Sequence, residues 1–217
     1  MAKALSGAAI LAATAALHAG AGRVILSLLS CQTSDCAPPD VMQREFKRLD
    51  LEQLHVVCGC GGGTSVQAVL LEVLQRSGGL VLDADGLNAV AQDSSMQNAL
   101  RQRAAHSATQ ATVITPHPLE AARLLDCNTA QAQNDRLKAA QELADRFQCS
   151  VVLKGSGTVI AAPGHTPRIN ITGNGRLAIG GTGDVLAGLV GARMAQGENT
   201  FEAACAAVAQ HLSLIHI

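Results

Sequence analysis

Residues 180–190 read Gly-Gly-Thr-Gly-Asp-Val-Leu-Ala-Gly-Leu-Val, a loop of small residues that runs directly into a helical pattern. Small residues leave backbone N–H groups free to face a ligand, and a helix start adds unpaired N–H groups and the positive end of its dipole. Such a place binds phosphate well. A carboxylate there would repel phosphate, so we expect Asp184 to be a base for a hydroxyl that attacks phosphorus. The alternative is an Asp that only caps the helix.

The composition is that of one globular α/β domain. The chain has 217 residues, of which 48% are hydrophobic and 15% are charged, so it has ample material for a core. Its formal net charge is -1, and it contains no Trp or Tyr. Nucleic-acid binding needs a basic surface and commonly uses aromatic stacking, so we exclude nucleic acid as a partner.

The cysteines and the N-terminus bear on localisation. The seven cysteines have no zinc-ribbon or CxxC spacing, so we expect buried reduced thiols in a cytoplasmic protein. The apolar run that ends at Cys31 resembles a lipoprotein signal, which remains an alternative, although His18 and Arg23 interrupt it. No charge-free run is long enough to cross a membrane, so we expect no membrane partner.

Helical and β-rich patterns alternate along the chain. This alternation predicts an α/β fold with a mostly parallel central sheet and helices on both faces. Residues 31–50 are expected to be a surface connection, and the last two strands a hairpin around Pro163-Gly164-His165. The predicted strands are Val24–Leu29, His55–Cys58, Leu80–Asp83, Thr112–Thr115, Val151–Lys154, Thr158–Ala161 and Arg168–Thr172, and the predicted helices are Ala8–His18, Ser65–Arg76, Pro118–Leu125, Thr129–Phe147 and Asp184–Gln196.

Polar and glycine-rich segments follow four successive strands. In parallel sheets, ligands bind beyond the carboxyl ends of the strands, so these segments together predict a binding site. They are residues 59–63 (Gly-Cys-Gly-Gly-Gly), 83–88 (Asp-Ala-Asp-Gly-Leu-Asn), 115–120 (Thr-Pro-His-Pro-Leu-Glu) and 154–158 (Lys-Gly-Ser-Gly-Thr).

Each of these segments also has a purely structural interpretation. Asp83 and Asp85 could bind a metal or a ribose, but we expect at least one of them to cap the next helix. Two prolines would stiffen the backbone around His117 and so hold its imidazole at a site, whereas a single histidine without this frame is weak evidence for a function. Glu120 could orient a magnesium-bound water, or it could simply favour the first turn of a helix. The segment 154–158 could wrap a nucleotide or form a hairpin turn.

Taken together, these motifs resemble the NAD(P)H-hydrate dehydratase family of the ribokinase-like superfamily. The resemblance covers about residues 7 to 211. The Thr-Pro-His-Pro element is the specific one, because kinases of the superfamily usually have Asn where His117 stands. The matching segments, in the family's order, are 7–9, 19–22, 83–88, 115–125, 152–158 and 180–186.

The resemblance implies a ribokinase-like fold and a repair enzyme. Such an enzyme uses ADP or ATP, with Mg²⁺, to phosphorylate the hydroxyl of hydrated NADH or NADPH. Phosphate then leaves and the ring double bond returns, so ADP gives AMP and phosphate. The implied site residues are Asp184 as base; Ala8, Gly61, His117 and Asp184 for the hydrated dinucleotide; and Lys154, Gly155, Ser156, Gly157, Thr158 and Gly183 for the adenine nucleotide.

The resemblance also implies partners and points to departures. An NAD(P)H-hydrate epimerase, fused or separate, and a homo-oligomer are the expected partners. The family's Gly-Pro-Gly-Leu-Gly is here residues 59–63, which lack Pro and Leu, so rigidity is in doubt. The family starts earlier, with a further strand, so we expect residues 1–211 to be one domain, incomplete at both ends. Residues 212–217 match a translated transposon end, so we expect a non-native tail.

Two other functions remain open. One is a ribokinase-like kinase of a small alcohol, which would leave a stable phosphate ester. The other is an inactive fragment that binds a nucleotide without turnover, because a missing strand exposes apolar surface and unpaired backbone groups.

Overall fold

A computed structural model describes residues 6–30, 33–106 and 111–213, and its centre is a six-stranded sheet. The strand order is β3-β4-β5-β6-β7-β8; β3 to β6 are mutually parallel, and β7 and β8 continue the sheet in antiparallel pairing. The predicted mostly parallel sheet is therefore confirmed. The strands are His55–Cys58, Gly79–Leu82, Thr112–Ile114, Ser150–Leu153, Val159–Ala161 and Arg168–Ile169.

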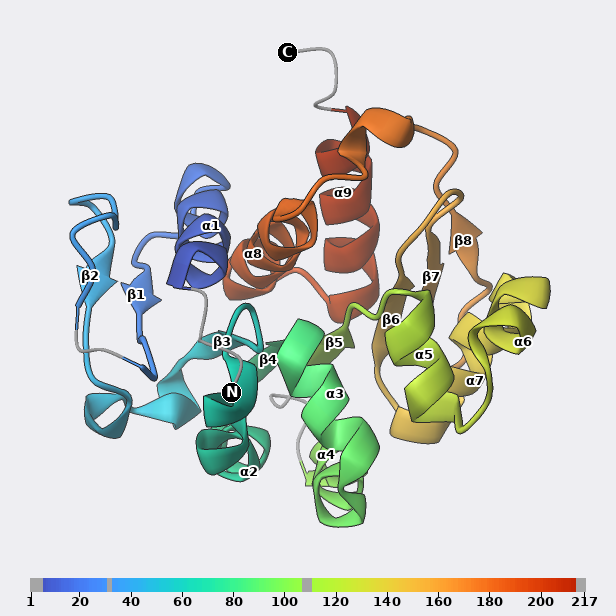
Figure 1. Cartoon of the computed structure of the whole chain (residues 1–217), viewed down its shortest axis with the longest axis horizontal. Coiled ribbons are helices and arrows are strands. Elements are labelled where there is room, and N and C mark those ends of the chain that lie inside the picture. The colour runs from blue at the N-terminus through green and yellow to red at the C-terminus, as the bar shows by residue number, and fades with distance from the viewer. Residues whose placement is uncertain (1–5, 31–32, 107–110, 214–217) are drawn as a thin grey trace.

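Helices cover both faces of this sheet, as Figure 1 shows. One face carries α2 (Gln67–Arg76), α3 (Ala84–Gln92), α4 (Ser94–His106), α5 (Pro118–Leu125) and α7 (Arg136–Phe147), with the short α6 (Thr129–Asn134) beside them. The other face carries α8 (Thr182–Ala195) and α9 (Thr200–Ser213). Short 3-10 turns occupy Phe46–Arg48, Leu51–Gln53, Gly63–Val66 and Gly175–Leu177.

The period of two along each strand explains the two cores. In β4, Leu80 and Leu82 pack with α2 to α7, whereas Val81 packs with α8 and α9. All residues of β4 and β6 are buried, because both faces of these central strands are covered. Because β3 to β6 are mutually parallel, their carboxyl ends lie at the same edge of the sheet.

The first part of the chain carries a two-stranded sheet of its own and packs against α8. β1 (Ile25–Leu26) pairs in parallel with β2 (Met42–Gln43), and α1 (Ser6–His18) packs beside them and against α8. The strand predicted at 24–29 is thus only two residues long and does not join the central sheet. An apolar cavity of about 230 Å³ lies between residues 23–29 and the region around β3.

Other predictions need correction as well. The helix predicted at 129–147 is broken, because Asp135 leaves helical geometry and caps α7 by accepting the Lys138 N–H at 3.0 Å. No element was predicted where α4 and α9 lie. The surface connection at 31–50 contains β2 and a buried Val41.

The last helix, α9, extends into the predicted non-native tail. α9 continues through Ser213, so Leu212 and Ser213 of the predicted tail are helical, whereas 214–217 and Cys31 lie outside the described residues. None of the helices in the described part of the chain is long and apolar enough to span a membrane.

Candidate functional site

An ion pair joins the ends of two strands. The Lys154 Nζ lies 2.6 Å from the Asp83 Oδ1, and the two side chains are 19% and 2% exposed. Asp83 follows β4 and Lys154 follows β6, so the pair passes over the end of the intervening β5. A buried pair of this kind fixes the relative positions of the two loops that carry it.

This pairing overturns the expected helix cap. Asp83 occupies the N-cap position of α3, but its side chain makes no cap hydrogen bond in the structure as described. Asp85 is also used elsewhere, because its Oδ2 accepts the Gly63 N–H at 2.7 Å. A buried carboxylate gains more from a full positive charge than from a backbone N–H, and that charge comes from a residue distant in sequence.

The glycine-rich loop after β3 lies against Asp83. Gly59 has φ +113, and a Cβ there would overlap the Asp83 carbonyl oxygen. Gly61 and Gly63 also have positive φ, of +64 and +55. The loop is fastened by the Gly63–Asp85 bond and by the Gly62 N–H, which donates to the Gly59 carbonyl at 3.3 Å. These contacts hold the loop although it lacks Pro and Leu.

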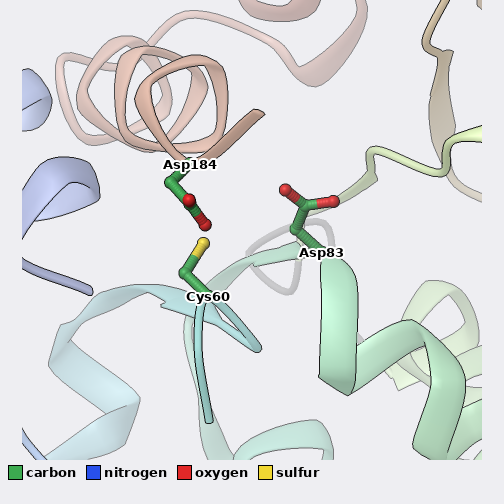
Figure 2. Close-up of side chains that lie close together, drawn as sticks. All are labelled: Cys60, Asp83 and Asp184. Carbon is green, nitrogen blue, oxygen red and sulfur yellow. The ribbon is translucent and has the colours of Figure 1, made fainter. Parts of the chain in front are cut away.

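Asp184 lies in the first turn of α8 and faces that loop. The N-cap of α8 is Gly181, with φ +95, so the interpretation of Asp184 as the cap residue is wrong. The Cys60 sulfur and one carboxylate oxygen each of Asp83 and Asp184 lie within 4.8 Å of one another. Figure 2 shows Cys60 and Asp83 approaching Asp184 from two loops.

The charge of Asp184 follows from these neighbours. Burial raises the pKa of the Asp184 carboxyl above its ordinary value, and the nearby Asp83 and Asp85 raise it further. The neighbouring Cys60 thiol and the Lys154 ammonium lower the pKa of Asp184 and so act in the opposite direction. A carboxylate whose pKa is raised is a stronger base, as a proton acceptor requires.

His117 and Glu120 form a closed pair at the start of α5. The His117 Nδ1 accepts the N–H groups of Leu119 and Glu120, while the His117 N–H donates to the Glu120 Oε2 at 2.8 Å. The other Glu120 oxygen lies 3.2 Å from the His117 Nε2. Both oxygens of Glu120 therefore already contact His117. The role predicted for Glu120, in holding a magnesium-bound water, stays a prediction.

Burial sets the charge of this pair. It raises the pKa of Glu120 to about 7, against the opposing effect of Lys154. It also lowers the pKa of His117, and the Lys154 ammonium lowers it further. Lys154 and Asp83 thus act electrostatically on both residues, which places His117 at the same edge of the sheet.

A second cavity, of about 460 Å³, adjoins the ion pair. Its lining includes all the residues predicted for the adenine nucleotide, Lys154 to Thr158 and Gly183, together with residues 170–175. The segment 154–158 is also the β6–β7 hairpin connection, so the hairpin interpretation is confirmed, and the binding of a nucleotide there stays a prediction. The Arg136 Nη2 donates to the Leu153 carbonyl at 3.0 Å and holds this connection in place.

The remaining predicted residues are placed less directly. A Cβ added at Gly183 would lie 3.3 Å from the Lys154 Nζ, so glycine allows the ammonium to approach the helix start. Gly61 follows Cys60 in the loop that faces Asp184. Ala8 lies on α1. Leu11 of the same helix lies close to the start of α8, since a Cβ added at Gly181 would be only 2.7 Å from it.

Sequence patterns missed several residues of this site. Cys60 was noted only as a departure in a glycine loop, and at least one of Asp83 and Asp85 was expected to cap a helix, with a metal or a ribose as the alternative. Arg136 gave no local signal. The position of Asp83 at a strand end was a usable signal, whereas Arg136 lies inside a helical pattern.

The ligand atoms of Cys60, Asp83 and Asp184 determine which metal ion could bind beside Asp184. Mg²⁺ takes oxygen ligands, which Asp83 and Asp184 offer, although the Asp83 Oδ1 is bonded to Lys154. The Cys60 sulfur suits a softer ion such as Zn²⁺. The carboxylates therefore fit a magnesium ion, and the complete trio fits a softer one.

Comparisons with known proteins agree with this geometry. Residues 2–214 match the family model described as NAD(P)H-hydrate dehydratase. The chain is 37% identical to the ADP-dependent (S)-NAD(P)H-hydrate dehydratase of Neisseria meningitidis, over 95% of this chain and 71% of the relative. It is 40% identical to a bifunctional NAD(P)H-hydrate repair enzyme of Gloeobacter violaceus, over 94% of this chain and 41% of that relative.

Two solved structures are similar as well. The ADP/ATP-dependent NAD(P)H-hydrate dehydratase of Bacillus subtilis, crystallised with ATP and Mg²⁺, has a TM-score of 0.76 and 29% identity, covering 96% of this chain and 76% of that one. A ribokinase-like superfamily protein of Enterococcus faecalis has a TM-score of 0.76 and 26% identity, covering 96% and 73%. The expected ribokinase-like fold is confirmed.

Proposed function

Because the chain belongs to the NAD(P)H-hydrate dehydratase family, we propose that it uses ADP to convert (S)-NAD(P)H hydrate back to NAD(P)H, with release of AMP and phosphate. One observation carries the proposal. Asp184 stands in the first turn of α8, between the glycine loop that follows β3 and the cavity bounded by residues 154–158. A base, a helix start and a nucleotide-sized space thus meet at one edge of the sheet.

The reaction needs a proton acceptor and a place for a phosphoryl group. Asp184 takes the proton of the ring hydroxyl, whose oxygen attacks the terminal phosphorus of ADP as the bond to AMP breaks. The N–H groups of Gly181 to Gly183, at the positive end of the α8 dipole, stabilise the transferring phosphoryl group. Phosphate then leaves with the C–O bonding electrons, and loss of a proton from the adjacent ring carbon restores the double bond.

The other site residues bind and orient. Lys154, Gly155, Ser156, Gly157, Thr158 and Gly183 contact the adenine nucleotide, and Ala8, Gly61 and His117 contact the hydrated dinucleotide. Lys154 also keeps Asp83 paired, so the two negative phosphates do not meet an unpaired carboxylate. A Mg²⁺ ion bound to the nucleotide would offset the negative charge of the phosphates. The carboxylate oxygens of Asp83 and Asp184 would be its protein ligands.

The test is direct turnover. The purified chain is incubated with hydrated NADH, Mg²⁺ and either ADP or ATP, while the absorbance of reduced nicotinamide is followed. We expect absorbance to return with release of phosphate, and an Asp184→Asn variant to lose this activity by about a hundredfold or more while melting normally. Wild-type turnover in Asp184→Asn would refute the assigned base.

The same assay separates the two other functions. A small-alcohol kinase would leave a stable phosphate ester and no reduced nicotinamide. An inactive fragment would show no turnover, and melting with and without ADP would tell whether it still binds the nucleotide. The His117 frame between prolines favours the dehydratase. An epimerase partner, a homo-oligomer, a cytoplasmic location and the limits 1–211 of the domain stay predictions.

A further inference from the structure

Arg136 bonds to the backbone of the segment 154–158, which lines the cavity of about 460 Å³. It is the first residue of α7. Its Nη2 donates to the carbonyl oxygens of Leu153 at 3.0 Å, Lys154 at 3.3 Å and Gly157 at 3.4 Å. Among the described residues, those that line the cavity do not include Arg136. Arg136 therefore acts on a bound nucleotide through this segment.

The guanidinium packs closely against Gly155. This glycine has φ +144, and a Cβ added there would lie 3.1 Å from both Nη atoms of Arg136. Gly157, whose carbonyl accepts a hydrogen bond from Arg136, also has positive φ, of +65. Glycine adopts such backbone angles without the cost that a Cβ would add. The two glycines thus allow both the turn of the segment and the close approach of the guanidinium.

Arg136 also helps to fix Lys154. The Lys154 N–H donates to the Pro116 carbonyl at 2.9 Å, and the Lys154 Nζ bonds to Asp83 at 2.6 Å. The Lys154 carbonyl accepts from Arg136, which gives this residue a third attachment. Because the same Nη2 bonds to Gly157, Arg136 connects Lys154 to the far end of the segment.

The hydrogen-bond partners of Arg136 are neutral oxygens. Its Nη1 donates to the Gln133 Oε1 at 2.6 Å, and the ion pairs within residues 6–30, 33–106 and 111–213 do not include Arg136. An ion pair with a carboxylate therefore does not explain an arginine at this position. A planar guanidinium donates in two directions at once, whereas a lysine ammonium is a point charge. Arg136 uses both arms, Nη1 toward α6 and Nη2 toward the carbonyls at the segment.

We propose that Arg136 is a positioning residue for the adenine nucleotide: its guanidinium holds the segment 154–158 in the conformation that contacts the nucleotide. This rests on the proposed function, in which Lys154 to Thr158 contact ADP. A segment that is ordered before the ligand arrives loses less conformational entropy on binding, so the affinity is higher. Arg136 should therefore change the affinity for the nucleotide and have little effect on proton transfer at Asp184.

The test replaces two arginines of α7 that each bond to a backbone carbonyl. Arg136→Lys keeps the positive charge but loses the fork. Arg146→Lys is the matched control, because the Arg146 Nη1 donates to the Leu124 carbonyl at 2.7 Å, outside the segment 154–158. Calorimetric titration with ADP measures the affinity, and thermal melting measures stability. We expect Arg136→Lys to raise the Kd for ADP about tenfold, which corresponds to about 1.4 kcal/mol. Arg146→Lys should leave the Kd unchanged even if it melts earlier.

Steady-state kinetics provide a readout that a purely structural role would not move. In Arg136→Lys we expect the KM for ADP to rise about tenfold, while kcat and the KM for hydrated NADH change little. A wild-type Kd for ADP in Arg136→Lys would overturn the proposal. So would an equal rise of the Kd in Arg146→Lys, because the effect would then follow stability and not the segment. Should Arg136→Lys fail to fold, Arg136→Gln and Arg146→Gln are compared by the same criteria.

A measurement without nucleotide or turnover keeps this test separate from the proposed function. Heteronuclear ¹H–¹⁵N NOE values of the amides of Gly155, Ser156 and Gly157 report fast backbone motion in the free protein. We expect lower values in Arg136→Lys than in wild type and unchanged values in Arg146→Lys. Unchanged values in Arg136→Lys would refute the role of Arg136 and leave the dehydratase reaction standing. A wild-type chain that binds ADP but does not restore NADH would refute the proposed function, and the comparison of ADP affinities would still decide the role of Arg136.

Discussion

Lys154 and Asp83 bond at 2.6 Å although 71 residues separate them in the sequence, because β4 and β6 lie on either side of β5. The ion pair connects the loops that follow β4 and β6 at the edge of the sheet. Its Lys154 also lines the cavity bounded by residues 154–158. The charges of the pair act on the pKa values of His117, Glu120 and Asp184.

The first prediction concerns this pair and stability. Lys154→Met leaves the Asp83 carboxylate buried without its cation, so we expect the free energy of unfolding to fall by about 3–5 kcal/mol. Urea unfolding followed by circular dichroism measures it. Arg76→Met is the control, since the Arg76–Glu72 pair is nearly half exposed and should contribute far less. Equal losses in the two variants would contradict the assignment of a structural role to the buried pair.

This pair also marks how far the sequence could lead. Strand ends, the glycine loops and the α8 start were all predictable, because hydrophobic runs and glycine clusters are local patterns. The partner of Asp83 was not, since it depends on the order in which strands assemble. The same limit explains Arg136, whose guanidinium reaches the carbonyl of Leu153 from within a helix.

Local competition explains the other misses. Asp135 stands inside a run with helical periodicity, but its side chain caps the second half and so ends the first. The apolar run around Ile25 suggested a long strand. Only Ile25 and Leu26 of that run pair with another strand, at Met42 and Gln43. Periodicity shows which residues are buried, but pairing depends on distant segments.

The second prediction concerns the pH dependence of kcat/KM, which reports the pKa values of the free enzyme. Asp184 must be ionised to accept a proton, and burial raises its pKa above the ordinary carboxyl value. Activity should therefore fall, as pH decreases, at a pH above the usual value of about 4 for an aspartate. Initial rates at substrate concentrations well below KM, taken across the pH range, measure the acidic limb of kcat/KM. A limb at or below the ordinary value would contradict the burial of this base.

The third prediction concerns Glu120 and the pH dependence of stability. Its folded-state pKa is about 7, above the value of 4.5 for a free side chain, so the folded state favours the protonated form. This contribution to stability is complete below the unfolded pKa and is lost as pH rises through the folded pKa. We expect Glu120→Gln to gain stability relative to wild type between pH 5 and pH 8.

Urea unfolding at the two pH values tests this expectation. Glu142→Gln is the control, because Glu142 is half exposed on α7 and should show no comparable trend. Glu120→Ala should be less stable than Glu120→Gln at both pH values, since it cannot accept the His117 N–H. A difference between wild type and Glu120→Gln that does not change with pH would refute the shifted pKa.

The fourth prediction concerns Gly59. A side chain there is strained at φ +113 and would overlap the Asp83 carbonyl oxygen, so Gly59→Ala should displace the loop that carries Cys60. We expect a loss of more than about 2 kcal/mol in stability together with a loss of turnover. Gly164→Ala is the matched control: it has φ +73 but nothing within 4 Å, so it should cost only about 1 kcal/mol.

The fifth prediction concerns soft metal ions. Cys60, Asp83 and Asp184 offer one sulfur and two oxygens within 4.8 Å, and a thiol yields its proton to Zn²⁺ or Cd²⁺ far more readily than to Mg²⁺. An ion held there would occupy the lone pairs that Asp184 needs as a base. We expect micromolar Zn²⁺ to inhibit turnover, a chelator to restore it, and Mg²⁺ in excess not to compete strongly.

The Cys60→Ser variant tests the role of the sulfur. Its inhibition by Zn²⁺ should weaken by about tenfold or more, because a hydroxyl does not ionise to replace the thiolate. Cys36 is an exposed cysteine, so the control variant Cys36→Ser should leave the inhibition unchanged. Equal inhibition of wild type and Cys60→Ser would show that the inhibitory ion binds elsewhere.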